Sequence, residues 1–303
     1  MSNFPASCCG VVGYKPPRGR NPVDPPFNLD PYCHTGPLAR SVADVLLLQN
    51  LLSGPHPDDP CTLPPHRIEV TEPSVRGLRV AVSSDLGFYP LDPEVAAALD
   101  DAVATFRDLG ARVEEVDLPW GEEVQEAALT HLRLIFGTSV APEADADWDR
   151  MTPYARAFAR AGLAVTPREY YRALGVAGDA GRSLGAAMAG VDLLICPTTA
   201  IPAVPAAFDP GTDRLEIGGR RVNPMLGWVM TPAFSMLSSY PVLAVPMGRA
   251  TSGVPIGLQI VGRPYDDDTV FRAGLAWEAA RGPWPPSAVR TTGAASAGTK
   301  ATV

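Results

Sequence analysis

Short apolar runs alternate along this chain with longer segments of helical periodicity, and this alternation is the feature that most limits the possible folds. Apolar runs predict buried strands at residues 9–14, 78–83, 192–197, 241–246 and 258–262. Residues 112–118 alternate between apolar and polar side chains, as a half-buried strand does. Strands that alternate with helices predict an α/β fold.

Helices are predicted from capping residues and from apolar periodicity. The clearest helix follows Asp92 as N-cap, with Pro93 in its first turn and Gly110 at its end. A second helix starts at Ser41, because Ser41 and Asp44 form a capping box ahead of leucines at helical spacing. Further helices are predicted over 122–136, 150–161 and 166–190, and from Asp266 onwards, where acidic residues suit the first turn.

Length, charge and cysteine content narrow the class of protein. A chain of 303 residues can form one large domain or two small ones. Its 25 basic and 33 acidic residues give a net charge of -8, which argues against nucleic acid or a membrane as partner. The five cysteines are an odd and irregularly spaced set, unlike a disulfide framework, so we expect a cytoplasmic location.

Two strings at opposite ends of the chain carry a family resemblance. Pro5-Ala6-Ser7, Cys9-Gly10-Val11-Val12-Gly13 and Lys15-Pro16 form the first, and Gly257-Leu258-Gln259-Ile260-Val261-Gly262-Arg263-Pro264 forms the second. Together they resemble the downstream part of the amidase signature family, which includes amidases and amidotransferase A subunits. The resemblance implies a mixed β-sheet flanked by helices, here incomplete at the N-terminus. It also implies hydrolysis of the carbon–nitrogen bond of a small amide, without cofactor or metal.

The family's catalytic segment has no full counterpart in this sequence. The resemblance implies a serine nucleophile, activated through a second serine in a cis peptide by a lysine base. Counting back from Pro5 places Met1 at the nucleophile position, and Asn3 stands where the family usually has arginine. Ser2 is the remaining serine candidate, although it lies one residue too close to the proline. We therefore expect a C-terminal portion of an amidase that is catalytically incomplete, with no catalytic residue assigned.

Four residues are candidates for the substrate pocket. Cys9 lies near the expected floor of the active site, and the resemblance places the loop with Tyr32, Cys33 and His34 near the substrate channel. A structural role for the cysteine and the histidine is the alternative. Arg18 and Arg20 are expected to anchor their own loop by salt bridges. The remaining histidines have no metal-ligand spacing, and no glycine loop for a cofactor is present.

The domain division and the alternatives for function complete these expectations. Residues 1–284 are assigned to a partial amidase signature domain, and residues 285–303, rich in Ala, Gly, Ser and Thr, to a disordered tail. One alternative is a truncated, non-catalytic product or pseudo-enzyme that still binds a ligand or a partner. Another is a hydrolase that uses Cys8 or Cys9 as nucleophile. Whether the final acceptor is water or an amine stays open.

Overall fold

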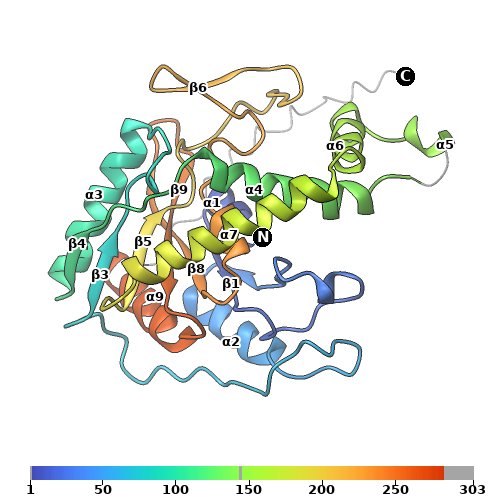
Figure 1. Cartoon of the computed structure of the whole chain (residues 1–303). Helices are drawn as coiled ribbons and strands as arrows, with labels where there is room; N and C mark the ends of the chain where they lie inside the picture. The colour runs from blue at the N-terminus through green and yellow to red at the C-terminus, as the bar shows by residue number, and fades with distance from the viewer. Residues whose placement is uncertain (1, 143–144, 283–303) are drawn as a thin grey trace, which may run out of the picture.

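A seven-stranded mixed sheet organises residues 2–142 and 145–282, which the computed structural model describes (Figure 1). Its strand order is β2-β1-β8-β9-β5-β3-β4. β3 pairs in parallel with β4 and with β5, whereas the other neighbouring strands pair antiparallel. The predicted mixed α/β fold is confirmed. Met1 and the predicted tail at 285–303 lie outside the described residues.

The elements have the following bounds. The strands of the sheet are β1 Val12–Lys15, β2 Leu38–Ala39, β3 Arg79–Val82, β4 Arg112–Glu115, β5 Leu193–Pro197, β8 Val242–Arg249 and β9 Pro255–Gly262, and a separate hairpin joins β6 Leu215–Ile217 to β7 Arg220–Val222. The helices are α1 Asn3–Cys9, α2 Val42–Leu52, α3 Pro93–Asp108, α4 Glu122–Leu132, α5 Asp145–Trp148, α6 Pro153–Leu163, α7 Pro167–Ala187, α8 Pro232–Met236 and α9 Asp267–Arg281, with a 3-10 turn at Phe27–Leu29 and a π-helix at Arg133–Gly137.

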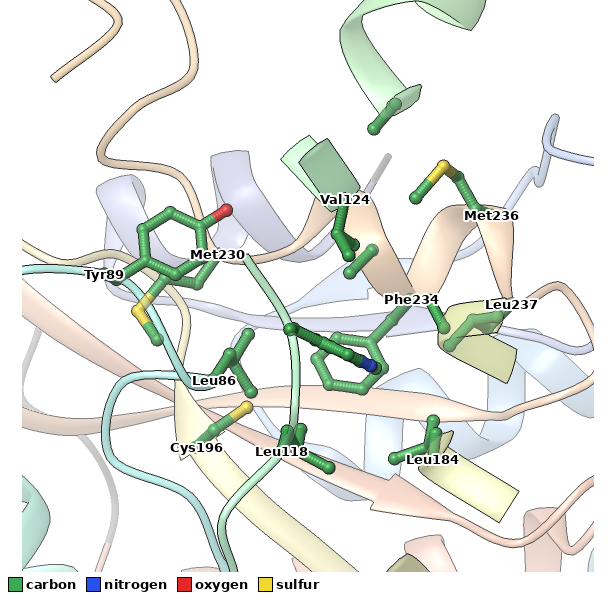
Figure 2. Packing of buried hydrophobic residues seen from close by; sticks show 14 of the residues in the cluster. Leu86, Tyr89, Leu118, Val124, Leu184, Cys196, Met230, Phe234, Met236 and Leu237 are labelled. Carbon is green, nitrogen blue, oxygen red and sulfur yellow. The ribbon is translucent and has the colours of Figure 1, made fainter. Parts of the chain in front are cut away.

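Helices cover both faces of the sheet because successive strand residues point to opposite sides. In β5, Leu194 and Cys196 belong to the apolar cluster under α4, α7 and α8, whereas Leu193 and Ile195 belong to the cluster under α2, α3 and α9. All four side chains are fully buried. Figure 2 shows part of the first cluster, to which Phe234 of α8, the following Leu237 and Leu184 of α7 belong.

Helix starts follow the predicted capping residues. Ser41 accepts a hydrogen bond from the Asp44 amide, Asp92 from the Glu94 amide, and Thr166 forms a full capping box with Glu169. Residues 3–9 form helix α1, so the strand predicted over 9–14 instead runs from Val12 to Lys15. This helix packs on β1, β8 and β9, where Phe4 meets Trp228 edge-on with ring centroids 5.2 Å apart.

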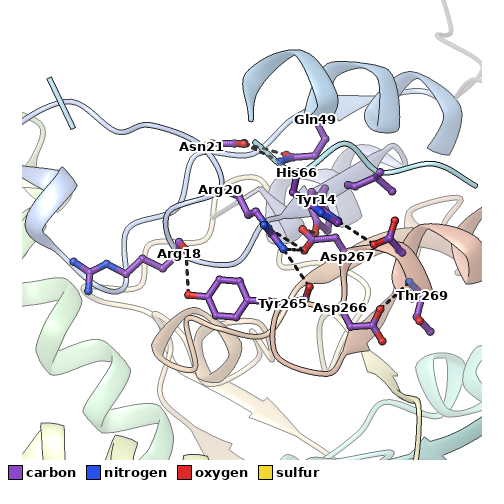
Figure 3. A network of polar contacts seen from close by, with 12 residues as sticks. Tyr14, Arg18, Arg20, Asn21, Gln49, His66, Tyr265, Asp266, Asp267 and Thr269 are labelled. Atoms are coloured by element: carbon purple, nitrogen blue, oxygen red, sulfur yellow. Dashed lines mark hydrogen bonds and ion pairs between the residues drawn. The ribbon is translucent and has the colours of Figure 1, made fainter. Parts of the chain in front are cut away.

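A buried polar network ties strand β1 to the last helix (Figure 3). The Tyr14 hydroxyl donates to Asp267 Oδ1 at 2.6 Å, and Arg20 forms an ion pair with Asp267 Oδ2 at 2.9 Å. The predicted salt bridge of Arg20 is therefore confirmed. Arg18 instead donates to Cys61 Sγ at 3.6 Å. Among the described residues, no helix is both long and apolar enough to span a membrane.

Candidate functional site

A cavity of about 230 Å³ lies between the loop that carries Tyr32, the end of α4 and helix α8. Most of its lining is apolar, and its polar side chains come from segments that are far apart in the sequence. The lining residues are Tyr32, Cys33, His34, Ala128, His131, Leu132, Phe136, Leu226, Pro232, Ser235 and Met236. Apolar walls with a few convergent polar groups are typical of small-molecule sites. A larger surface hollow of about 570 Å³ around Glu69 and Arg76 is lined mainly by charged and polar side chains.

The helical wall of this cavity is irregular. At Arg133 the α-helix α4 passes into a π-helix that ends at Gly137. Such turns contain an extra residue and are frequent at functional sites. Leu132 and Phe136 from this region line the cavity, and Phe136 stacks on Phe27 with ring centroids 5.0 Å apart. The π-turn thus connects the cavity wall to the loop before Tyr32.

His131, near the end of α4, contacts the loop that carries Asp30 and Tyr32. Its Nε2 lies 3.0 Å from the Asp30 carboxylate, and its Nδ1 lies 3.2 Å from the Tyr170 hydroxyl. Because a carboxylate only accepts, the Nε2–H donates to Asp30, and Nδ1 lies within hydrogen-bond distance of the Tyr170 hydroxyl. The Tyr32 ring packs on the imidazole at 4.3 Å. With both nitrogens engaged, His131 acts as a rigid wall that holds Tyr32 in place.

His34 lines the cavity with an imidazole that can accept a hydrogen bond. Its Nε2 lies 3.2 Å from the Ser235 carbonyl oxygen, so Nε2 carries the proton and Nδ1 carries the lone pair. Burial, reinforced by the charge of Lys15, lowers the pKa of His34 well below its ordinary value. The imidazole is therefore neutral at physiological pH and can accept a hydrogen bond.

Lys15 is a feature that the sequence did not reveal as unusual. It ends strand β1, only 3% of the residue is exposed, and its Nζ has no hydrogen-bond partner among the described residues. Burial lowers the pKa of Lys15 to about 7, although the distant Asp267 carboxylate opposes this shift. Near pH 7 the charged and the neutral form of this buried amine are therefore both populated. Alternation along β1 gives no signal for this burial, because all four residues of the strand are buried.

Only some of the candidate residues predicted from the sequence line the cavity. The cavity brings together Tyr32, Cys33 and His34, whereas Cys9 is exposed at the end of α1 and is not among the lining residues. Burial, with the Asp30 charge, raises the pKa of the Cys33 thiol, which keeps it a poor nucleophile. Ser2 is buried, and its Oγ donates to the Tyr14 carbonyl oxygen at 2.6 Å. The pocket roles stay predictions.

The reactive alternatives and a metal site find no support here. Burial and the neighbouring Cys9 raise the pKa of the Cys8 thiol, so this cysteine is not an activated nucleophile. The Asp266-Asp267-Asp268 run begins α9, as predicted. Within residues 2–142 and 145–282, no three histidine, cysteine or acidic side chains gather as a metal site would require.

Comparison with known proteins identifies relatives across most of the chain. The family model described as Amidase matches residues 3–271. The chain is 32% identical over 294 residues to the acylamidase of Rhodococcus erythropolis, covering 93% of this chain and 59% of that protein. It is also 30% identical over 293 residues to the amidase of Pseudomonas putida, covering 91% of this chain and 60% of that protein.

Solved structures agree in fold. The crystal structure of a bacterial aryl acylamidase of the amidase signature family superposes with a TM-score of 0.79 at 26% identity, covering 92% of this chain and 60% of that one. The 6-aminohexanoate cyclic dimer hydrolase complexed with substrate gives a TM-score of 0.69 at 28% identity, covering 92% and 62%. The chain thus spans about three fifths of the length of the relatives it matches.

Proposed function

Because the chain belongs to the amidase family, we propose that it forms the substrate pocket of a hydrolase that cleaves the carbon–nitrogen bond of a small amide. The observation that carries this proposal is the cavity of about 230 Å³ beside Cys33, His34 and Ser235. Its apolar lining with a few polar side chains suits a small molecule. We assign the reaction to the cytoplasm, a location that five free cysteines support.

On this proposal, the apolar and the polar residues of the cavity together orient the amide. Leu132, Phe136 and Met236 receive the apolar part of the substrate. The Nδ1 lone pair of His34 accepts a hydrogen bond from the substrate N–H, because Nε2–H already donates to Ser235. The neutral state of His34 favours this role, since a protonated imidazole could only donate.

We propose further that the 303-residue chain does not hydrolyse amides by itself. Covalent amide hydrolysis needs a nucleophile activated by a positioned base. The Ser2 hydroxyl donates to the Tyr14 carbonyl, and Lys15 Nζ has no hydrogen-bond partner in the described part of the chain, so these two residues form no serine–lysine pair there. About two fifths of the length of the relatives has no counterpart in this chain. On this proposal, an equivalent polypeptide supplies the nucleophile and the base.

A chimera tests both statements. The part of the Rhodococcus erythropolis acylamidase without a counterpart is fused to this chain, and turnover of chromogenic anilides and short aliphatic amides is measured for the chimera and for the chain alone. We expect turnover by the chimera and none by the chain. His34→Phe in the chimera should weaken catalysis, whereas His56→Phe, at an exposed position, should not.

Three outcomes would count against the proposal. Hydrolysis by the chain alone would refute its inactivity. A chimera that folds but binds and cleaves no amide would refute the assignment of the pocket. Unchanged kinetics in the His34→Phe chimera would remove this histidine from the substrate site.

A further inference from the structure

Helix α2 exposes several leucines on the side that faces away from the fold. Val42 and Val45 are buried against the fold, as is Gln49. The opposite side of the same helix carries four exposed leucines, Leu47, Leu48, Leu51 and Leu52, which we call the leucine face. Leu51 is 72% exposed and Leu47 is 59% exposed. The exposed polar side chain among them is Asp44, one turn before Leu48.

The two edges of the sheet differ in charge. The β4 edge is closed to further pairing by charge, because Arg112, Glu114 and Glu115 are exposed there. The β2 edge is short and uncharged. It consists of Leu38 and Ala39 alone, and Leu38 is 43% exposed. β2 also lies next to α2 in the chain, so the uncharged edge and the leucine face lie at the same side of the fold.

We infer that the leucine face and the β2 edge bind a polypeptide equivalent to the two fifths of the amidase relatives for which this chain has no counterpart. The choice of this binding partner rests on the lengths of the relatives. The relatives share this fold over 91–93% of the chain, yet the shared part is only 59–60% of their own length. The remaining polypeptide needs a surface on the shared fold, and this side offers apolar contacts and an uncharged strand edge.

No other helix in the described part of the chain has more than two exposed large apolar side chains. Helix α6 has Tyr154 and Leu163, of which Leu163 is 58% exposed, and α7 has Tyr171 and Leu174. Isolated apolar residues of this kind are ordinary on protein surfaces. Four adjacent leucines on two turns of one helix form a continuous patch, which marks an interaction site.

Co-expression tests the inference without relying on catalysis. The chain is produced together with the part of the Rhodococcus erythropolis acylamidase that has no counterpart here, and complexes are measured by light scattering and native mass spectrometry. The two parts of the acylamidase itself, co-expressed in the same way, are the positive control. We expect a one-to-one complex whose dissociation constant rises by roughly tenfold or more for Leu47→Lys with Leu51→Lys. Leu163→Lys, at a similarly exposed leucine, should leave it unchanged.

Several results would overturn the inference. Absence of a complex, when the acylamidase parts associate, would exclude this occupant. A complex that is insensitive to the leucine substitutions would place the contact elsewhere. A homodimer that the substitutions dissociate would make a second copy the occupant. Because the substituted leucines are exposed, circular dichroism should show an unchanged fold, and Leu51→Gln provides a milder variant. Since binding is the readout, a negative result leaves the proposed hydrolysis to its own test.

Discussion

At the scale of single residues, Lys15 makes a prediction about pH. The pKa of Lys15 falls from 10.5 to about 7, chiefly because of burial. Between these two values the unfolded chain holds a proton on Lys15 that the folded chain does not, so the free energy of unfolding rises with pH across this window. Below about pH 7 the folded chain bears the full cost of a buried charge.

We therefore expect Lys15→Met to stabilise the chain below pH 7 by about 3–5 kcal/mol, and to have little effect near pH 10.5. Methionine keeps a similar volume without the charge. Urea unfolding across this pH range gives the difference between wild type and variant. Lys15→Arg, which stays charged, should be less stable than wild type throughout. Identical pH slopes for wild type and Lys15→Met would contradict the prediction.

The residues of the site were only partly predictable. Tyr32, Cys33 and His34 could be found because they follow one another in a loop that the resemblance places near the substrate. His131 could not, since its role depends on Asp30 and Tyr170, which lie 101 and 39 residues away in the chain. Contacts of this kind leave no local pattern in the sequence, and burial of Lys15 depends on the same long-range packing.

At the scale of elements, the start of α9 separates three aspartates that look equivalent in the sequence. Asp266 accepts from the Thr269 amide as N-cap, and Asp268 forms a part-exposed pair with His66. Asp267 is fully buried between Tyr14 and Arg20. The helix therefore depends on the middle carboxylate for its attachment to β1 and to the loop that carries Arg20.

We expect Asp267→Ala to lower the free energy of unfolding by about 3–5 kcal/mol, because it leaves the mostly buried Arg20 charge without its partner. Asp268→Ala, its neighbour, removes a part-exposed pair and should cost at most about 1 kcal/mol. Chemical denaturation of both variants at neutral pH compares the two. Equal losses would show that the buried network contributes no more than a surface pair.

Most elements were predictable from local chemistry, and the exceptions have a common cause. Capping residues located α2, α3 and α7, and apolar runs located β5, β8 and β9. Helix α1 was missed because Pro5-Ala6-Ser7-Cys8-Cys9 has little intrinsic preference for a helix, and packing of Phe4 on Trp228 helps to stabilise it. The π-turn at Arg133–Gly137 was predicted as ordinary helix, since nothing local distinguishes it.

At the scale of the whole molecule, one sheet connects two hydrophobic clusters that share no helix. β5 contributes Leu194 to the cluster under α4 and α7, and Leu193 to the cluster under α2 and α9. The order of the strands could not be predicted, because β1 pairs with β8 across more than two hundred residues. Because of this long-range pairing, the sheet is complete only when the two ends of the chain have come together. Both clusters pack on that sheet, so both depend on this pairing.

The consequence is cooperative unfolding, which would also distinguish a folded unit from a loose fragment. Trp277 lies in one cluster, whereas Trp120 and Trp228 lie in the other. Fluorescence of wild type and of Trp277→Phe should give one urea midpoint, coincident with that of far-ultraviolet circular dichroism. The shared strands make partial unfolding costly, because loss of either cluster exposes one whole face of β5, β8 and β9. Separate midpoints would mean that the sheet does not hold its two faces together, and that the chain needs the polypeptide proposed to cover its leucine face in order to fold as one unit.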